Sequence, residues 1–369
     1  MEHLFLTFDR AVNFLTRPEI LFPLSTVLLV ATLKFAHVWT RPPVALGLGG
    51  LLVLLGLYSW FDWPGVSHQS FRDSLSKPDN VPIVLILGSL AFFTWLSLRK
   101  ATLNDARIAR NLPPLEAAEK SRKVLVWPDL VYTELIAMVV CSVVLIVWSL
   151  LLKAPIEEPA NIARTPNPSK APWYFLGLQE LLVYFDPWLA GVLIPGLIIL
   201  GLIVIPYVDR NPKGNGYYTL AERKGAIFVF LFGFFILWVL GVFIGTFLRG
   251  PGWNFFGLYE NWSVTKVEPL QNINVSEIVW SKLLGRPVPT WWLSREIWGL
   301  LIVIGYFTIV PAVFARTLGR KLFLELGAIR FGIVANLGLI MLAVPLKMVA
   351  RWLFNLKYVV YLPEILTNI

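Results

Sequence analysis

The sequence is poor in charged residues and in cysteine, and each shortage excludes a class of protein. Only 15% of its 369 residues are charged and 57% are hydrophobic, against roughly 25% charged in an average soluble domain. So much apolar surface needs lipid or partner protein to cover it, which excludes disorder and disfavours an ordinary soluble fold. The single cysteine, Cys141, excludes an internal disulfide, a thiolate iron–sulfur cluster and a multi-cysteine zinc site. We expect it to be a small core residue.

Histidine is equally scarce, with only His3, His37 and His68 in the chain. A bis-histidine haem needs two imidazoles that face each other, and no two of these histidines lie at helical spacing. We expect His37 to be an interfacial polar residue. The sequence also lacks a Cys-x-x-Cys-His motif, a glycine-rich phosphate loop, a nucleophile elbow and paired metal carboxylates. We therefore predict no metal ligands here and expect any redox centres on other chains.

Long apolar runs, in contrast, are abundant. Runs of roughly 18 to 25 residues span a bilayer core, and eight are present: 20–39, 44–63, 82–98, 129–152, 187–207, 225–248, 297–315 and 331–349. Residues 1–19 carry apolar residues at helical spacing between charges, which predicts an amphipathic interfacial helix. The fold class is therefore all-α: a polytopic membrane protein with about eight transmembrane helices and an N-terminal interfacial helix.

The positive charges favour one side of the membrane. Loops 40–43, 99–128, 208–224 and 316–330 hold 16 Lys and Arg in 66 residues. The segments on the other side, 1–19, 64–81, 153–186, 249–296 and 350–369, hold 14 in 139 residues. The denser set faces the cytoplasm by the positive-inside rule, which puts both termini on the outer side. The net charge of +9 thus reflects membrane orientation, and we expect lipid contacts and no nucleic-acid partner.

Two stretches divide the chain into three expected parts. The charged stretch 99–128 ends an N-terminal part, 1–126, and the Trp-rich outer loop 249–296 begins a C-terminal part, 249–369. We interpret that loop as an aromatic interface belt or as a docking surface for an extracytoplasmic electron carrier. The middle part is 127–248.

The most informative segment is 165–188, which is aromatic, half apolar and lies on the outer side between two predicted spans. Irregular backbone at membrane depth must be buried in protein or line a cavity. We therefore expect this segment to dip into the interface and to line a cavity, although its composition alone also suits an anchoring loop.

Several blocks in the region 127–248 occur in the order and spacing of a known family. They are Trp127-Pro128-Asp129-Leu130, Thr165-Pro166 followed by Ala171-Pro172-Trp173-Tyr174, Leu189-Ala190-Gly191-Val192, and Ile205-Pro206-Tyr207-Val208-Asp209. The region resembles the C-terminal part of cytochrome b, which stands alone as subunit IV in cytochrome bf-type complexes.

The resemblance implies a function as well as a fold. It implies a non-haem subunit of a bacterial cytochrome bc-type quinol oxidoreductase in the inner membrane, with menaquinol as the expected quinol. Partner subunits would carry the b haems, a Rieske 2Fe-2S cluster and a c-type cytochrome, in a dimeric complex. Quinol oxidation on the outer side would contribute to proton translocation in a respiratory chain. Two alternatives stay open: a structural anchor with a degenerate quinol site, and a transporter.

The resemblance also indicates the site residues. It places Ala171, Pro172, Trp173, Tyr174 and Phe175 at the outer quinone site, with Tyr174 shaping the pocket. Family members with Pro-Glu-Trp-Tyr use the Glu to accept a quinol proton, and this chain has Pro172 at that position.

Proline has no ionisable group, so another side chain must take the proton. Glu180, roughly 12 Å further along a helix, sits in an apolar setting that suits a group that takes and hands on protons. We expect Glu180 to be the substitute acceptor. The alternative is that it is a paired structural acid.

Two further acids, Asp129 and Glu134, lie near the cytoplasmic start of a predicted span. The resemblance implies a quinone-reduction and proton site there. Asp129 is also well placed to stabilise a helix start. Glu134 is an intramembrane acid and therefore a candidate functional residue.

Overall fold

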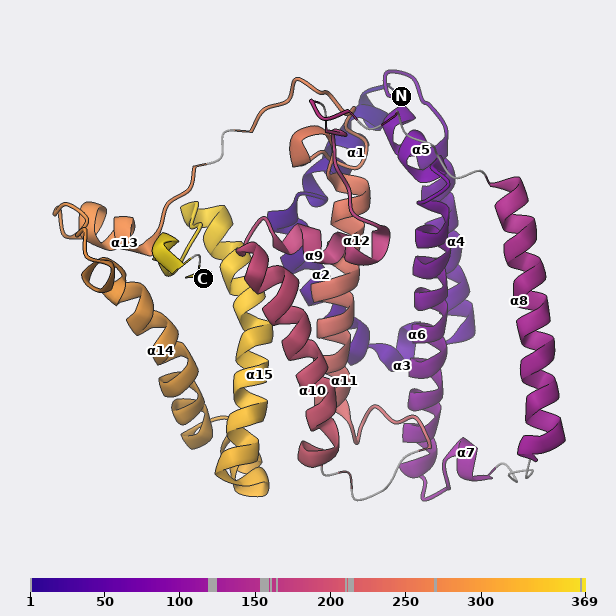
Figure 1. Cartoon of the computed structure of the whole chain (residues 1–369). Coiled ribbons are helices and arrows are strands. Elements are labelled where there is room, and N and C mark those ends of the chain that lie inside the picture. The colour runs from indigo at the N-terminus through magenta and orange to yellow at the C-terminus, as the bar shows by residue number, and fades with distance from the viewer. Residues whose placement is uncertain are drawn as a thin grey trace.

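The chain folds into long helices that run between two ends of the molecule (Figure 1). The computed structural model describes residues 2–118, 125–152, 159, 161–163, 165–209, 211, 216–268, 271–365 and 367–369. The strands in this part of the chain are β1 (Tyr361–Leu362) and β2 (Thr367–Asn368), which pair antiparallel near the C-terminus. The all-α prediction is confirmed.

The described residues of the N-terminal part form seven helices. They are α1 (Glu2–Leu15), α2 (Pro18–Lys34), α3 (Ala36–Trp39), α4 (Pro42–Trp60), α5 (Gln69–Ser76), α6 (Val81–Ile108) and α7 (Leu115–Ala118). Proline stands in the first turn of α2, α4 and α6, where its missing N–H costs no helical hydrogen bond. Residues 99–108 of the charged stretch 99–128 belong to helix α6. Residues 119–124 lie outside the described residues.

The middle part contains three long helical segments and one short helix between them. Its elements are η1 (Val126–Leu130), α8 (Val131–Leu151), η2 (Trp173–Phe175), α9 (Leu176–Leu181), η3 (Leu189–Leu193), α10 (Ile194–Val208), α11 (Lys224–Leu231), η4 (Phe232–Val239), α12 (Leu240–Phe243) and η5 (Ile244–Leu248). The elements α11, η4, α12 and η5 form one continuous helix, Lys224–Leu248.

The C-terminal part ends in a helical pair. Its elements are η6 (Pro251–Trp253), α13 (Val275–Glu277), η7 (Ile278–Leu283), α14 (Trp292–Arg316), α15 (Arg320–Phe354) and η8 (Pro363–Ile365). We expected a loop over 316–330, whereas α15 already begins at Arg320. The helix changes direction at Gly327. Its φ of 74° is a backbone angle that glycine adopts readily because it has no Cβ atom.

The predicted number of spans agrees with the structure. Within the described residues, seven helices are long and apolar enough to cross a membrane, or eight if the bent pair of α1 and α2 forms one span. Those two helices meet at 80°, as an interfacial helix that precedes a spanning one would. The chain is a multi-pass membrane protein.

Helices α6, α10 and α14 each end at the lower end of the molecule in Figure 1, and α3 lies in the lower half. The N-terminus lies at the upper end and the C-terminus at about mid-height. Which end faces the cytoplasm stays a prediction.

One hydrophobic core joins all three parts of the chain. It contains Phe22 of α2, Ile236 of η4, Val344 and Met348 of α15, and five side chains of the middle part: Leu181, Tyr184, Phe185, Leu189 and Ala190. The parts bounded at 126 and 248 therefore share a core, and their division stays a prediction.

Helix α8 contributes nothing to that core. It stands apart from the other helices in Figure 1, and none of its apolar window, within Val126–Leu151, is buried. Cys141 lies exposed on this helix, so the expectation of a core position was wrong, because the helix lacks neighbours within the chain.

Candidate functional site

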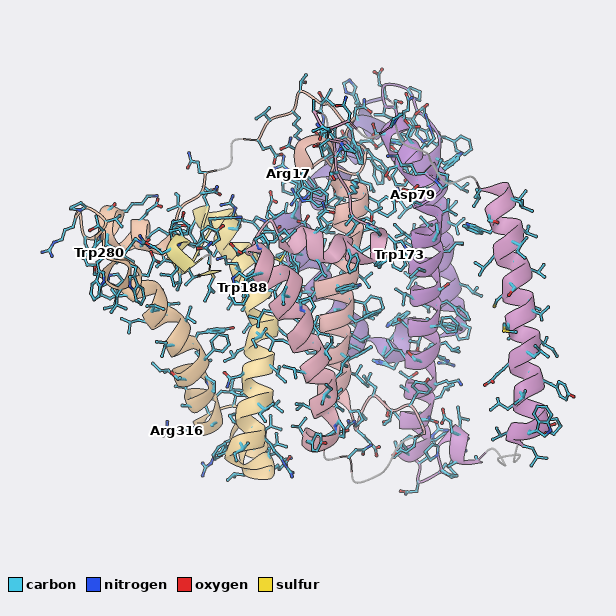
Figure 2. All side chains as sticks on the ribbon, viewed as in Figure 1. Arg17, Asp79, Trp173, Trp188, Trp280 and Arg316 are labelled. Atoms are coloured by element: carbon cyan, nitrogen blue, oxygen red, sulfur yellow. The ribbon has the colours of Figure 1, made fainter. Side chains whose placement is uncertain are left out.

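The candidate site is the segment 165–188, which we call the re-entrant segment because it lies between the spans formed by α8 and α10. It contains η2 and α9, and α9 lies below the loops at the upper end of the molecule (Figure 1). Trp173 lies on this segment at the level of α12, whereas Arg316 marks the opposite end (Figure 2). That the segment dips into the membrane interface and lines a cavity stays a prediction.

Glycines hold α9 tightly against the long helix 224–248. A Cβ atom at Gly241 would lie 3.3 Å from Cα of Gly177, and one at Gly245 would lie 3.2 Å from the Leu176 carbonyl oxygen. The spacing Gly241-x-x-x-Gly245 puts both glycines on one helix face, which lets two backbones approach closely in a membrane. This packing fixes the height and direction of α9.

A buried ion pair also holds α9 in place. The guanidinium of Arg249, the residue after η5, donates from Nη2 to Glu180 Oε1 at 2.7 Å and from Nε to Glu180 Oε2 at 2.9 Å. Glu180 is 2% exposed and Arg249 is 7% exposed. A two-pronged contact of this kind is the strongest hydrogen-bonded geometry that a carboxylate can make.

Two more groups complete this cluster. The hydroxyl of Tyr184 donates to Glu180 Oε1 at 3.3 Å, and Arg249 Nη1 donates to the Trp253 carbonyl at 3.0 Å. Burial raises the pKa of Tyr184, and the Glu180 charge raises it further. Burial alone would lower the pKa of Arg249, but the Glu180 carboxylate outweighs it and the pKa is raised. Arg249 therefore stays charged and Tyr184 stays a neutral donor.

This is the arrangement that a paired structural acid requires. Both oxygens of Glu180 accept hydrogen bonds from Arg249, and almost none of the side chain is exposed. Whether Glu180 also accepts a quinol proton stays a prediction.

The turn 171–175 precedes α9 and is clamped by a single side chain. Gln179 Oε1 accepts from the Ala171 N–H at 2.8 Å, and Gln179 Nε2 donates to the Ser169 carbonyl at 2.9 Å. Pro172 is exposed at the start of the turn. The clamp holds the backbone in the shape that aims the following aromatic residues.

Those three aromatic residues point in different directions. Trp173 packs against a small core around Ile83, Val242 and Phe247, whereas Tyr174 is 48% exposed and Phe175 is 50% exposed. The rings of Tyr174 and Phe175 lie 4.7 Å apart between centroids. The chain thus offers two adjoining aromatic faces to whatever lies beside the turn.

The comparison with known proteins fits this segment. Residues 159–247 match the family described as Cytochrome b(C-terminal)/b6/petD. Residues 159–247 are a cytochrome b C-terminal domain. No solved structure matches the chain. The domain supports a role as a membrane subunit of a cytochrome bc- or bf-type quinol oxidoreductase.

The cytochrome b C-terminal domain contains the re-entrant segment and ends within η5, but it leaves α8 outside. Asp129 lies in η1 and Glu134 in the first turn of α8, and both are exposed. The Thr133 hydroxyl donates to the Asp129 backbone carbonyl at 2.9 Å. The start of α8, which carries both acids, lies at the lower end of the molecule, whereas α9 lies in the upper half (Figure 1).

Sequence reasoning missed Lys170, which directly precedes the turn of the cytochrome b C-terminal domain. Its Nζ donates to the Thr246 carbonyl at 2.7 Å and lies 4.9 Å from the Trp262 ring centroid. Burial lowers the pKa of Lys170 to about 7, and the charge of Lys77 adds to the effect. The amine is thus poised between its charged and neutral forms at neutral pH.

The histidines do not suit a haem. His68 Nδ1 lies 3.0 Å from the Phe61 carbonyl and His68 Nε2 lies 3.0 Å from Asp9 Oδ2, so both ring nitrogens are engaged. His3 lies on α1 and His37 on α3, in opposite halves of the molecule (Figure 1). Nor do the described residues contain a group of three or more His, Cys, Asp or Glu that suits a metal ion.

Proposed function

We propose that this chain is the non-haem membrane subunit of a bacterial cytochrome bc-type quinol oxidoreductase, and that its re-entrant segment forms one wall of the quinol-oxidation pocket. The observation that carries the proposal is the coincidence of two features. The segment lies inside the cytochrome b C-terminal domain, and it presents exposed aromatic faces from a rigidly held turn.

The geometry suits a flat, lipid-soluble substrate. The faces of Tyr174 and Phe175 offer stacking surface for a quinol ring. Behind them, the glycine contacts of α9 and the Glu180–Arg249 pair keep the wall from shifting. A pocket wall must hold its shape if a quinol is to meet an electron acceptor in a fixed geometry.

Quinol oxidation also requires a group that takes a proton. Such a group must come within hydrogen-bond reach of the quinol hydroxyl. Glu180 is the buried acid of the segment, but its oxygens accept hydrogen bonds from Arg249. Lys170 is less buried, lies next to the turn and is half neutral near pH 7. We assign the proton-accepting role to Lys170 and the holding of α9 to Glu180.

Electrons would leave through redox groups on partner subunits, because no pair of histidines in this chain suits a b haem. We infer a di-haem cytochrome b subunit, a Rieske iron–sulfur protein and a c-type cytochrome as partners, and menaquinol as the substrate. With the re-entrant segment on the outer side, the protons released there would contribute to a proton-motive force.

The uncovered helix α8 supports a complex of several chains. Glu134 lies exposed near the start of this helix, and a charged side chain that faces lipid is costly. Cover by the haem-bearing partner would remove that cost. Asp129 and Glu134 would then face the partner on the cytoplasmic side, where a quinone-reduction site belongs.

A purified complex tests the proposal. We expect b- and c-type haem spectra and quinol-dependent reduction of cytochrome c, which Tyr174→Ala and Phe175→Ala lower with little loss of assembly. Phe93→Ala, which removes a similarly exposed ring from α6, is the control and should keep full turnover. A colourless complex would refute the redox function.

One observation favours a second function. Pro172 stands where the family carries its acid, and Glu180 is ion-paired, as in a structural anchor with a degenerate quinol site. A haem-bearing complex whose turnover is unaffected by both aromatic variants would favour the anchor.

A further inference from the structure

A cleft of about 510 Å³ lies away from the re-entrant segment, where α2 ends and α11 begins. We call it the α2–α11 cleft. Figure 1 shows α3 between α2 and α6 in the lower half of the molecule, where the cleft is formed. Its size is typical of pockets that hold small ligands. Its apolar lining consists of Val30, Leu33, Ala36, Leu220 and Phe228.

The polar lining of the cleft is positively charged. Lys34, His37 and Lys224 line it and are exposed. Among the described residues, neither lysine has a carboxylate within ion-pair distance. Lys34 Nζ lies 5.5 Å from the centroid of the Phe35 ring. In the part of the chain that the structure describes, the two lysines therefore lack an anionic partner.

The single acid in the lining is already engaged. Asp105 Oδ1 accepts from the Thr219 hydroxyl at 2.6 Å, and Asp105 Oδ2 accepts from the Ala221 N–H at 3.0 Å. These bonds tie the segment before α11 to α6. Asp105 thus makes no ion pair with either lysine, and its one negative charge leaves the two lysines in excess.

The cleft lies where the apolar span 224–248 begins. Lys224 is the first residue of the span 224–248, and Lys34 is the last residue of α2. Next to Lys224, a Cβ atom at Gly225 would meet nothing within 4 Å, so the first turn of α11 is open. Its N–H groups add to the attraction for an anion.

The apolar surface continues from the cleft along α2. Val30, which lines the cleft, is 48% exposed, and Val27, about one turn before it, is 63% exposed. A ligand with a charged head and apolar chains would satisfy both the lysines and this surface. A small soluble anion would satisfy the lysines alone.

We propose that the α2–α11 cleft binds an anionic phospholipid. The phosphate lies between Lys34 and Lys224, and the acyl chains run along α2 and α11. Lysine is a common point-charge partner of phosphate, and basic pockets between membrane helices on the cytoplasmic side suit anionic headgroups. The lipid then joins α2 of the N-terminal part to α11 of the cytochrome b C-terminal domain.

Lipid binding to the intact, delipidated complex tests this assignment. Phosphatidylglycerol and the zwitterionic phosphatidylcholine are titrated separately, and bound lipid is counted by native mass spectrometry. The variants are Lys34→Met with Lys224→Met, and Ala221→Phe, which fills the cleft while keeping the backbone N–H for Asp105. Lys321→Met removes one exposed charge at the same end of the molecule, outside the cleft, and is the matched control.

Wild type and the Lys321→Met control should prefer phosphatidylglycerol. The double lysine variant should lose affinity on the order of tenfold or more, and Ala221→Phe should lose the bound lipid. Equal binding of the two lipids by wild type would overturn the proposal, as would a double variant that binds like wild type. Displacement by inorganic phosphate at millimolar concentration would assign the cleft to a free anion instead.

Discussion

The Glu180–Arg249 pair allows a sharp prediction about stability. Glu180→Gln removes the negative charge and keeps the shape of the side chain. Arg249, 7% exposed, then holds a buried positive charge without a counter-charge. Its bond to the Trp253 carbonyl at 3.0 Å remains, but a carbonyl dipole cannot replace a carboxylate.

The expected loss follows from burial. Removing one partner of a buried ion pair costs about 3–5 kcal/mol, because the other charge is left uncompensated. Replacing both partners with apolar residues of similar volume is often nearly neutral. We therefore expect Glu180→Gln to destabilise the protein strongly, and Glu180→Met with Arg249→Met to recover most of that loss.

The chain provides a matched control pair. Arg223 donates to both oxygens of Asp209 at 2.8 and 2.7 Å, which is the same two-pronged geometry. These two side chains are about a third exposed, and exposed pairs contribute about 0–1 kcal/mol. Asp209→Asn should therefore shift the melting temperature much less than Glu180→Gln.

Thermal unfolding of the purified complex in detergent, followed by tryptophan fluorescence, measures both shifts. The 16 Trp of the chain report on its unfolding. Equal melting temperatures for the Glu180→Gln and Asp209→Asn variants would refute the reasoning from burial. A Glu180→Gln variant that melts normally but fails to oxidise quinol would return the proton-accepting role to Glu180.

Three further predictions concern the same segment. Between about pH 7 and 10.5, the stability of the wild type should rise with pH, because the unfolded chain binds the proton that the folded Lys170 amine has lost. Lys170→Met should remove this part of the rise. Melting curves across that pH range, with Lys321→Met as the control, measure it. Gly241→Leu should destabilise by about 1–3 kcal/mol through overpacking against Gly177, and should lower quinol oxidation as α9 moves; assembly on native gels and turnover measure this. Pro172→Glu should restore turnover to the Lys170→Met variant, measured as quinol:cytochrome c activity against pH. If turnover is not restored, the turn 171–175 does not take part in proton transfer.

Much of the fold followed from the sequence because a bilayer leaves few options. Backbone groups in lipid must be satisfied within a helix, so apolar length alone predicts the spans. The predicted run 225–248 matches the helix Lys224–Leu248 for this reason. The helix α15 extends further than the predicted run 331–349, since the charges at Glu325 and Arg330 ended the apolar run but did not prevent a helix.

The site was harder to predict, because its contacts join residues far apart in the chain. Arg249 entered the sequence argument only as one charge of an outer loop, yet it lies 2.7 Å from Glu180. No local pattern indicates that pairing. A usable signal was present in Gly241-x-x-x-Gly245, which marks a helix face built for close packing. The lowered pKa of Lys170 depends on burial that only the folded chain provides.

The exchange of an acid for Pro172 separates two tasks that one glutamate would combine. A carboxylate in the turn would have to face the substrate and also hold the segment in place. Here Pro172 fixes the backbone of the turn, and Glu180 forms a buried ion pair with Arg249. Under the proposed function, proton uptake then falls to a group at the rim that is able to exist without charge. An amine with a lowered pKa meets that need, since its neutral form requires no counter-ion. The chain can therefore lack the family's acid at this position and still line a working quinol pocket.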